Sequence, residues 1–532
     1  MEKGCLAIVL HAHLPFVRHP EHEDFLEENW LYEAITETYI PLLLALDTFV
    51  GQGIDFRLTL SISPPLATML LDPLLQARYL RRIEKLIELA EKEIQRTAPE
   101  PPFNRLARFY HGRLLQVRTA FIDRFGRDLI AAFRRLQDLG KVEILAGAAT
   151  HGYLPLLSVN ESAVRAQVRL GTEQYRELFG RDPRGFWLPE CGFYPGVDEL
   201  LDAEGIRFTI LETHGITRAR PRPGYGVYAP VCCPSGVAVF GRDPESSRQV
   251  WSAAEGYPGD HDYREFYRDI GHDLDLDYIR PYLHGDGIRS DTGFKYFRIT
   301  GKTEAKEVYD PLQAERKADL HAEDFLLDRC GETARLNSAM DRKPIIVAPF
   351  DAELFGHWWF EGVSWLSHLI RKTSLDQNTL RLTTLSEYLL DSPPCQVATP
   401  CASSWGRNGF NETWLSPQSD WIYPHLHHGA GIMEKLAAER PYARGAELRA
   451  LNQAARELLL AQSSDWAFMI NCGTTAEYAV ERTKAHLLRL NRLKDEIEAG
   501  AIDEARLSAI EEQDNIFPNL DYRIFGPKSS SA

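Results

Sequence analysis

The sequence is short of the features that mark membrane-spanning and disulfide-stapled chains. Its eight cysteines are scattered and no two are spaced as a CxxC pair, so we expect reduced thiols rather than a disulfide framework. No unbroken run of about eighteen apolar residues occurs, so no membrane span is expected. The apolar stretch from Cys5 to Leu10 is short and is followed at once by His11, which is unlike a cleavable signal peptide. These absences predict a cytoplasmic protein with no membrane partner.

Positive charge is also in short supply. The chain has 60 Lys and Arg against 76 Asp and Glu, which gives a net charge of −16. Such a chain repels phosphate backbones, so nucleic acid is not an expected partner. The spacing of Asp273, Asp275 and Asp277 resembles the start of a calcium loop. However, the sixth position is Tyr278 rather than Gly and the twelfth is His284 rather than Glu, so we reject an EF-hand.

What is present is enough chain for a large α/β domain and an appendage. At 532 residues the protein exceeds one ordinary domain. Short apolar strands alternate with helical patterns, which is typical of a parallel barrel or a related sheet. The expected strands are Cys5 to Leu10, Ile54 to Ile62, Val142 to Leu145, Phe186 to Leu188, Ile206 to Leu211 and Ile345 to Ala348. Between Glu212 and about Lys302 regular periodicity is lost, which predicts a binding cleft or a lid.

Two regions are expected to be helical. Residues 64–140 carry apolar residues at helical spacing, such as Ile83, Leu86, Ile87 and Ala90, and predict a helical insertion. After Pro393 and Pro394 the pattern changes again. Helices are expected at His427 to Gln462, Thr474 to Glu498 and Ile502 to Gln513. We therefore predict a catalytic domain at residues 1–394, including the insertion, and a helical domain at 395–532 that completes the cleft.

Two carboxylates follow apolar strands in matching positions. Asp351 follows Ile345 to Ala348, which Pro349 is expected to close, and Glu190 follows Phe186 to Leu188. Active sites of parallel α/β folds lie at the carboxyl ends of the strands. Paired acids among tryptophans suit glycoside chemistry, in which one carboxylate attacks the anomeric centre and the other transfers a proton.

Other side chains near these acids have a purely structural interpretation as well as a functional one. His11 and His13 project to one face if the first strand continues, where they are either a solvated strand end or a ligand-binding pair. Trp187, Trp358 and Trp359 taken singly are more often core than sugar platforms. Trp405 and Trp414 lie among Gly406, Asn408 and Gly409, so exposure and sugar stacking are expected for them.

Five segments occur in the order of a known family. HAHLPF, the segment ending in His151, WLPECGF, APFDAELFGHWW and SSDWAFM resemble the five motifs of glycoside hydrolase family 57, and the whole chain resembles its glycogen branching enzymes. The resemblance implies a (β/α)7 barrel with a helical insertion and an all-helical C-terminal domain. It implies retaining chemistry on α-1,4-glucan without a metal or other cofactor. Glu190 would be the nucleophile and Asp351 the general acid/base.

The resemblance and the neighbouring aromatic and polar residues give a set expected to line the donor and acceptor subsites. These are His11, His13, His151, Trp187, Arg264, His272, His357, Trp358, Trp405, Trp414, Asp465 and Trp466. The expected partners are α-1,4-glucan chains as donor and acceptor, and the protein is expected to be a monomer.

The chain departs from the family pattern at two places. Branching enzymes of the family carry a long loop with a tyrosine at its tip, which we place near Val231 to Gly236. Here that segment reads VCCPSG, and Tyr225 and Tyr228 are the nearest tyrosines. His272 also stands where an aromatic platform is expected. These departures make an amylase-like α-1,4-glucan hydrolase the main alternative to a branching transferase.

Two further hypotheses come from other classes. One is a metal-dependent hydrolase or deacetylase with His11, His13, Asp351 and His357 as ligands. The other is a glucan-binding protein that retains the aromatic residues and does not turn substrate over.

Overall fold

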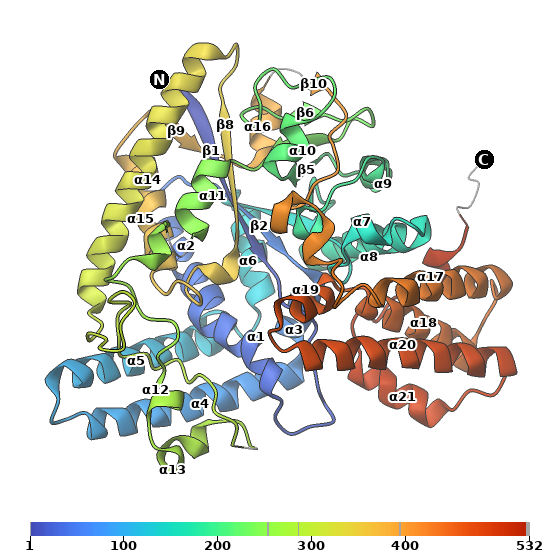
Figure 1. The fold of residues 1–532 in the computed structure, drawn as a ribbon, viewed down its shortest axis with the longest axis horizontal. Helices are drawn as coiled ribbons and strands as arrows, with labels where there is room; N and C mark the ends of the chain where they lie inside the picture. Colours follow the sequence, from blue (N-terminus) through green and yellow to red (C-terminus); the bar gives the residue numbers. More distant parts are fainter. Residues whose placement is uncertain (1, 253–254, 286, 393–394, 528–532) are drawn as a thin grey trace.

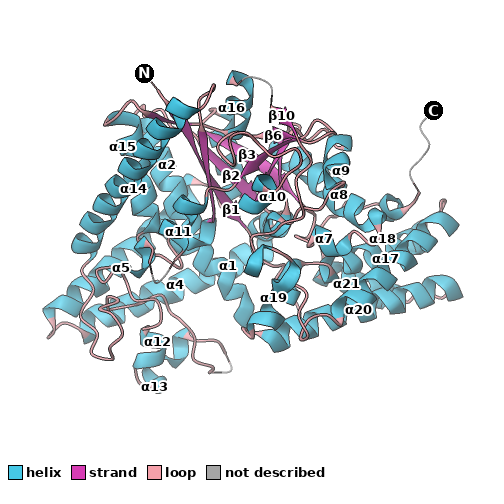
Figure 2. Cartoon of the chain, turned by 45° about the horizontal axis from the view of Figure 1, so that its top comes forward, coloured by secondary structure: helices cyan, strands magenta, loops and turns pink. Residues whose placement is uncertain are grey.

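The computed structural model describes the chain except for residues 1, 253–254, 286, 393–394 and 528–532. A curled sheet occupies the centre, flanked by helices, and a bundle of C-terminal helices lies to one side (Figure 1). Seen after a 45° turn, the strands form one continuous curved surface behind helix α10 (Figure 2). The expected α/β class is therefore confirmed.

Parallel strands build the sheet in the order β7-β5-β4-β3-β2-β1-β8. Their bounds are β1 Gly4–Ala12, β2 Leu58–Ile62, β3 Val142–Gly147, β4 Gly185–Trp187, β5 Phe208–Leu211, β7 Ala238–Gly241 and β8 Ile345–Asp351. All nine residues of β1 are buried, as expected for a strand covered on both faces. The two ends of this path meet where Asp243 N donates to Val347 O at 2.8 Å, which curls the sheet into a barrel with a seam. Three shorter strands are attached to it: β6 Val231–Cys232, β9 Leu380–Leu382 and β10 Gln396–Val397.

Strand β8 does not end at Pro349. It continues to Asp351, in parallel register with β1 from Cys5 opposite Ile345 to His11 opposite Asp351. The backbone groups of Val347 point to the seam, and those of Pro349, two residues on, point the same way. Because no continuous ladder forms at the seam, the missing N–H of proline costs little there. The prediction that Pro349 closes the strand is wrong for this reason.

The expected insertion is helical. Its helices are α3 Pro64–Leu71, α4 Pro73–Arg96, α5 Pro101–Thr119 and α6 Leu129–Asp138. Side chains of Ser63 and Asp72 accept hydrogen bonds from the first turns of α3 and α4, and Pro64 and Pro73 stand at the first helical positions. The amphipathic pattern of α4 is confirmed, since Ile83, Leu86, Ile87 and Ala90 are all buried.

A helical run from Leu26 to Gly51 precedes the insertion. It contains α1 Asn29–Ala34 and α2 Ile40–Gly51, joined by a π turn at Ile35–Tyr39. Among the described residues this run alone is long and apolar enough to cross a membrane, and 61% of its most apolar window is buried in the protein. That burial is typical of a core helix.

The segment expected to be irregular contains regular elements. Besides β6 and β7 it holds α10 Thr213–Thr217, α11 Pro244–Trp251, α12 Ile270–Asp273 and α13 Leu276–Ile279. Strand β7 was not predicted because its apolar run is only four residues long and lies between Gly236 and Gly241. The remaining helices of the barrel are α7 Leu154–Leu157, α8 Glu161–Phe179, α9 Val197–Ala203, α14 Pro311–Ala339, α15 Gly362–Leu375 and α16 Leu385–Asp391.

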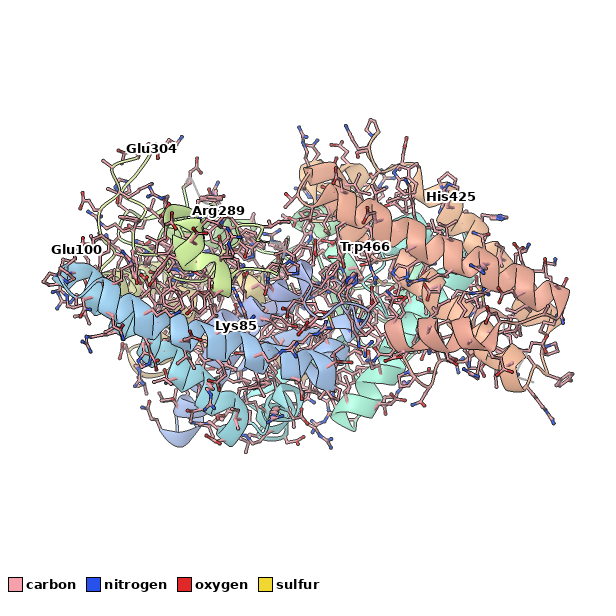
Figure 3. The ribbon with its side chains drawn as sticks, turned by 90° about the horizontal axis from the view of Figure 1, so that it is seen from below. Lys85, Glu100, Arg289, Glu304, His425 and Trp466 are labelled. Carbon is pink, nitrogen blue, oxygen red and sulfur yellow. The ribbon has the colours of Figure 1, made fainter. Side chains whose placement is uncertain are left out.

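The C-terminal helices form a bundle beside the barrel. They are α17 Ile422–Glu439, α18 Gly445–Ala461, α19 Ser464–Cys472, α20 Ala476–Ala499 and α21 Glu504–Gln513. The single helix expected from His427 to Gln462 is two helices, because Pro441 and the left-handed Gly445 (φ +59°) interrupt it. Helix α19 reaches back to the barrel, where Ser464 N donates to His151 O at 3.0 Å. In the view from below, Trp466 of this helix lies between the barrel and the bundle (Figure 3).

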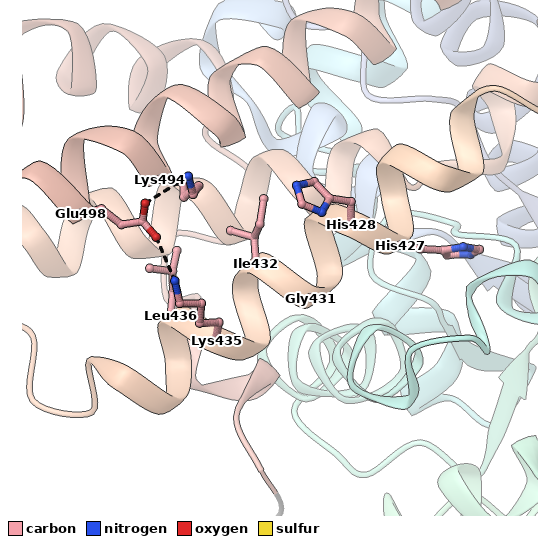
Figure 4. A pocket seen from close by; sticks show the side chains of 8 residues that line it. All are labelled: His427, His428, Gly431, Ile432, Lys435, Leu436, Lys494 and Glu498. Carbon is pink, nitrogen blue, oxygen red and sulfur yellow. Dashed lines mark hydrogen bonds and ion pairs between the residues drawn. The ribbon is translucent and has the colours of Figure 1, made fainter.

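An open groove of about 440 Å³ runs along the bundle between α17 and α20 (Figure 4). Glu498 lies in it between Lys435 and Lys494, with carboxylate to ammonium distances of 3.2 and 3.1 Å. Its lining contains none of the residues expected to carry the chemistry.

Candidate active site

The two predicted catalytic carboxylates lie at the carboxyl end of the sheet. Asp351 is the last residue of β8 and stands opposite His11, which in turn stands opposite Ser61 of β2. Glu190 lies in the short turn Pro189–Cys191 that follows β4. Glu190 and Cys191 have φ values of +62° and +50°, and His151 has +57°. Left-handed conformations at non-glycine residues are costly and concentrate at functional sites.

The Glu190 carboxylate receives one hydrogen bond on each oxygen. Trp405 Nε1 donates to Oε2 at 2.7 Å, and Ser464 Oγ donates to Oε1 at 2.9 Å. Trp405 belongs to the loop after β10, and Ser464 is the first residue of α19. Glu190 is therefore held by two segments that lie far from it in the sequence.

The hydrogen bond from Ser464 to Glu190 determines which atoms donate and which accept in a longer chain of hydrogen bonds. Since the Ser464 hydroxyl proton points to Glu190, its oxygen accepts from His151 Nδ1 at 2.9 Å. His151 Nε2 then carries a lone pair and accepts from His11 Nε2 at 3.0 Å. His11 Nδ1 has no hydrogen-bond partner among the described residues. Burial lowers the pKa of both His11 and His151 far below the usual range, so both rings are neutral, as this arrangement requires.

His13 is instead charged. Its Nε2 lies 3.0 Å from Asp465 Oδ2 and its Nδ1 lies 2.8 Å from Ser63 Oγ. Burial opposes the charge, but the Asp465 carboxylate outweighs it and raises the pKa of His13. Burial also opposes the ionisation of Asp465, but His13 lowers the pKa of Asp465 to about 2. An imidazolium-carboxylate pair thus joins β1 to α19.

The two carboxylates have different electrostatic surroundings. Burial raises the pKa of Asp351 well above its usual range, and the neighbouring Glu353 and Glu190 carboxylates raise it further. Burial also raises the pKa of Glu190, but the hydrogen bonds from Trp405 and Ser464 oppose that rise. When their surroundings give two carboxyl groups different pKa values, the group with the higher pKa serves as the acid and the other as the anion. Asp351 is suited to hold a proton and Glu190 to act as a carboxylate.

Aromatic rings pack against the histidines and carboxylates of the site. The His11 ring stacks on Trp187 at 4.6 Å, and Trp187 meets Trp405 edge to face at 5.1 Å. Trp187 is 1% exposed, so the His11 ring packs on a buried indole.

The structure corrects two expectations about tryptophans. Trp414, expected to be exposed, is 1% exposed and stacks on Tyr153 at 4.2 Å. Glycines around it allow the loop to fold this tightly, because a side chain at Gly406 would come within 2.6 Å of the Trp414 ring. Trp466, expected to line a subsite, is also 1% exposed and donates from Nε1 to Leu460 O at 2.8 Å. Both belong to the packing that supports the site.

Three predicted residues gather around Glu37 of the π turn. Arg264 donates to Glu37 Oε1 at 2.8 Å, and His357 Nδ1 lies 3.2 Å from Glu37 Oε2. Beside them Trp358 stacks on Phe266 at 5.0 Å and is 58% exposed. The backbone of Trp358 donates to Glu353 O at 3.2 Å, which ties this group to the loop that follows Asp351.

His272 is connected only indirectly to the residues around Glu37, through Asp291 and then Lys295, whose Nζ lies 2.6 Å from Asp291 and 4.8 Å from the centre of the Phe266 ring. It is exposed on α12, and its Nε2 lies 3.0 Å from Asp291.

The ligand set proposed for metal chemistry is not assembled, since His357 belongs to the Glu37 group. A different trio, His13, His151 and Asp465, has donor atoms within 4.8 Å of one another. His13 is already paired with Asp465 and Ser63, and His151 is bonded to His11 and Ser464. Both nitrogens of each histidine are therefore engaged within the site, and the trio as it stands offers no free nitrogen to a cation.

Sequence reasoning missed several residues of the site. Ser464 directly precedes the predicted Asp465 in SSDWAFM, and that adjacency was the available signal. Arg242 follows the unrecognised strand β7. It lies 3.0 Å from Glu212 and 5.7 Å above the Trp405 ring, and its charge opposes the rise in the pKa of Asp351. Tyr39 and His13 N both donate to the Glu353 carboxylate.

Comparison with known proteins identifies the family of the chain. Residues 7–399 match the domain described as glycosyl hydrolase family 57. Residues 425–525 match the C-terminal domain of 1,4-alpha-glucan branching enzymes. A 1,4-alpha-glucan branching enzyme of Thermococcus kodakarensis is 33% identical over 97% of this chain and 77% of its own length.

Two solved structures share the whole fold. The alpha-amylase AmyC from Thermotoga maritima is 45% identical, with a TM-score of 0.92 over 98% of this chain and 99% of that one. The family 57 branching enzyme of Pyrococcus horikoshii is 33% identical, with a TM-score of 0.89 over 99% and 97%. The catalytic domain, the branching-type C-terminal domain and these full-length similarities lead to one conclusion: the chain belongs to glycosyl hydrolase family 57.

Proposed function

We propose that the protein is a retaining α-glucan transferase that cleaves α-1,4 bonds and transfers the released chain to a 6-hydroxyl, as in glycogen branching. One observation carries this proposal. The part of the chain that matches a branching-enzyme C-terminal domain supplies Ser464 to Glu190 and Asp465 to His13. The names of two full-length relatives, both branching enzymes, support the same activity.

The mechanism follows from the two carboxyl groups. Glu190 attacks C1 of a glucose unit while Asp351 protonates the leaving oxygen, and a glycosyl-enzyme forms. Asp351, now ionised, takes the proton of the incoming 6-hydroxyl, and the new α-1,6 bond releases Glu190. Two inversions at C1 retain its configuration. Retaining enzymes of this kind hold the two carboxyl groups about 5 to 5.5 Å apart.

The other residues bind and shield rather than react. His11 and His151 are bonded to each other, His13 and His151 are bonded to α19, and among the three histidines His11 Nδ1 alone has no hydrogen-bond partner in the described part of the chain. The exposed face of Trp358 can stack on a glucose ring, since its other face is covered by Phe266. We place this ring on the path of a bound glucan chain.

Hydrolysis is the second candidate, because AmyC, the 45% identical structure, is titled an alpha-amylase. The hairpin at Val231 to Gly236 supports it, since a tight turn with Gly236 N bonded to Cys233 O replaces the long loop expected of a branching enzyme. Tyr228 points to Glu332 of α14, at 2.9 Å, and does not supply the missing ring. Transfer and hydrolysis differ only in the acceptor that reaches the glycosyl-enzyme.

The test is to incubate the protein with amylose and to count α-1,6 linkages by enzymatic debranching, with Glu190→Gln as the inactive control. A branching enzyme produces new chains after debranching, with few new reducing ends before it. New reducing ends without new branches would instead assign the hydrolase.

We also propose that the protein acts as a monomer, because Trp405 and Ser464 of the same chain already supply one donor to each oxygen of Glu190. A cytoplasmic location stays a prediction from the sequence.

A further inference from the structure

Arg242 stands at the carboxyl end of the sheet, one residue after strand β7. Its backbone N donates to Leu211 O of β5 at 2.8 Å, so Arg242 lies beside Glu212, the residue that follows β5. On the seam side of the barrel, β5 and β7 lie between β4, which precedes Glu190, and β8, which ends in Asp351. Arg242 therefore brings a cation to the same end of the barrel as the two carboxylates.

The guanidinium group of Arg242 is anchored on two sides. Its Nη1 donates to Glu212 Oε2 at 3.0 Å, and Glu212 Oε1 accepts from Thr213 N at 2.9 Å. Its Nε donates to Ser247 Oγ of α11 at 2.7 Å, and that hydroxyl donates to Asp243 O at 2.8 Å. The Arg242 and Glu212 side chains are 14% and 17% exposed, so solvent screens their ion pair little. The guanidinium group thus has a fixed place.

This anchored cation lies against the indole of Trp405. Its Cζ is 5.7 Å from the ring centre, within the range of a cation–π contact. Trp405 lies in the loop after β10, and its backbone N donates to Glu190 O at 3.0 Å, which fixes its backbone but not its ring. The ring must be oriented separately for Nε1 to reach Glu190 Oε2 at 2.7 Å. Trp187 and Trp251 meet the ring edge to face at 5.1 and 6.3 Å, and Arg242 adds a charged, anchored neighbour.

We propose that Arg242 is a positioning residue, which holds the Trp405 indole so that its N–H is directed at Glu190. Arg242 acts through this ring and not on the reacting atoms. The inference rests on the proposed function, in which Glu190 must be ionised to attack, and it applies equally to transfer and to hydrolysis. Without Arg242 the indole is free to turn, and Glu190 loses the donor on Oε2. Turnover should fall, and Glu190 should become protonated at a higher pH.

The other groups around Glu190 stay in place when Arg242 is replaced. Ser464 Oγ keeps its bond to Oε1, and His151 Nδ1 lies 3.8 Å from the same oxygen. The charged or titratable groups that also face this carboxylate are Asp465 on α19, His13 after β1 and Asp351 on β8. Replacing Arg242 can therefore act on Glu190 through the indole N–H or through the lost charge itself. The two effects are separable, because the first requires the indole.

The experiment measures the pH dependence of kcat/KM for the full-length protein on amylose. Cleaved bonds are counted as reducing ends after debranching, so that transfer and hydrolysis count alike. Arg242→Gln should lower kcat/KM by about 10-fold and move the acid limb to higher pH. Trp405→Phe, which keeps a ring but no N–H, should move the acid limb in the same direction. Arg248→Gln, at an exposed arginine of α11, is the matched control and should change neither value.

The double variant separates the indole from the charge. In the Trp405→Phe background, Arg242→Gln should move the acid limb no further, because the N–H through which it acts is already absent. Arg242→Lys keeps the charge but cannot bond Glu212 and Ser247 with the same planar fork. It should show the changes of Arg242→Gln to a smaller extent, and it supplies the test if Arg242→Gln does not fold.

A second measurement does not depend on turnover. In protein carrying isotope-labelled tryptophan, the Nε1–H resonance that is absent from Trp405→Phe belongs to Trp405, and it should move as Glu190 titrates. In Arg242→Gln this movement should be smaller and centred at a higher pH, whereas Arg248→Gln should match wild type. If wild type cleaves no α-1,4 bond while this resonance responds to Arg242→Gln, the proposed function fails and the positioning role stands. The positioning role is overturned if the titration of the resonance is unchanged, or if Arg242→Gln moves the acid limb as far without the indole as with it.

Discussion

Among single residues, Glu190, the proposed nucleophile, depends on groups that lie outside its own motif. Glu190 has one donor on each oxygen, from Trp405 and from Ser464. Ser464 Oγ also accepts a hydrogen bond from His151, so its own hydroxyl proton is donated to Glu190. Its hydroxyl therefore orients Glu190 and favours the ionised form of that carboxylate.

Replacing Ser464 tests this role. Ser464→Ala removes a hydrogen bond to a charged group, which typically contributes about 1.5 to 3 kcal/mol, so kcat/KM should fall by about 10- to 100-fold. The acid limb of the pH-rate profile should move to higher pH, because Glu190 loses a group that favours its ionised form. Ser464→Thr should restore both values in part. Ser158→Ala, which removes a hydroxyl bonded only to Pro155 O among the described residues, should change neither.

Asp351 illustrates the cost of a buried acid. Its pKa is raised in the folded state, so folding is penalised once pH exceeds the unfolded pKa of about 3.9, and the penalty grows up to the folded pKa. Asp351→Asn should therefore abolish turnover and stabilise the protein at pH 7 by about 1 kcal/mol. Urea unfolding at pH 7 and pH 3.5 measures the effect. Equal stabilisation at both pH values would contradict it.

Asp465 should behave in the opposite way. Its pKa is lowered to about 2, so its contribution to stability is complete above the unfolded pKa and is lost as pH falls from about 4 to 2. The shift corresponds to about 2 kcal/mol. Asp465→Asn should destabilise the protein at pH 7 and much less at pH 2.5, as measured by thermal unfolding. A pH-independent loss would show that the pairing with His13 is not its cause.

At the scale of elements, periodicity located most strands but not all of them. The strands at β1, β2, β3, β4, β5 and β8 were predicted because their apolar runs are bounded by polar or turn residues. Strand β7 is four residues long, and with it Arg242 was missed. The predicted end of β8 at Pro349 was wrong, because a proline is tolerated in a strand where its missing N–H faces no continuous ladder. The sequence does not show that this side of β8 faces the seam. Their positions after apolar strands pointed to Glu190 and Asp351, and motif order gave their expected roles. The hydrogen bond from Ser464 could not be predicted, because it depends on the packing of α19 against the barrel.

Trp358, in the loop after β8, is expected to contribute to substrate binding. Trp358 offers one open face, and Phe266 covers the other. Trp358→Ala should raise KM for amylose several-fold, since an aromatic contact contributes about 0.5 to 1.5 kcal/mol beyond its buried area. It should leave kcat nearly unchanged, and Trp358→Phe should recover most of the loss. An equal loss of kcat would place Trp358 in the catalytic step. Tyr267→Ala, at a neighbouring exposed ring, is the control.

At the scale of the whole molecule, the barrel and the C-terminal bundle form one catalytic unit. The barrel supplies Glu190, Asp351 and the histidines, and α19 supplies Ser464 and Asp465. Composition and periodicity predicted the α/β class and the helical C-terminal region. They could not show which C-terminal residues touch the barrel, because such contacts have no local signature.

Trp405 and Ser464 hold Glu190 within one chain, so we expect activity without assembly. We expect a particle of about 60.5 kDa by light scattering and a specific activity that does not change on dilution. Activity that falls as the protein is diluted, together with a larger particle, would show that a second copy contributes to the site.

Trapping the glycosyl-enzyme tests whether Glu190 is the nucleophile of a retaining reaction for which Asp351 supplies the proton. A fluorinated α-glucosyl substrate with a good leaving group needs no acid for the first step, so Asp351→Asn should form the adduct and release it slowly without a base. Mass spectrometry should find one sugar on the peptide that carries Glu190, and none in Glu190→Gln. An adduct on another carboxylate, or turnover by inversion with no adduct, would contradict the account.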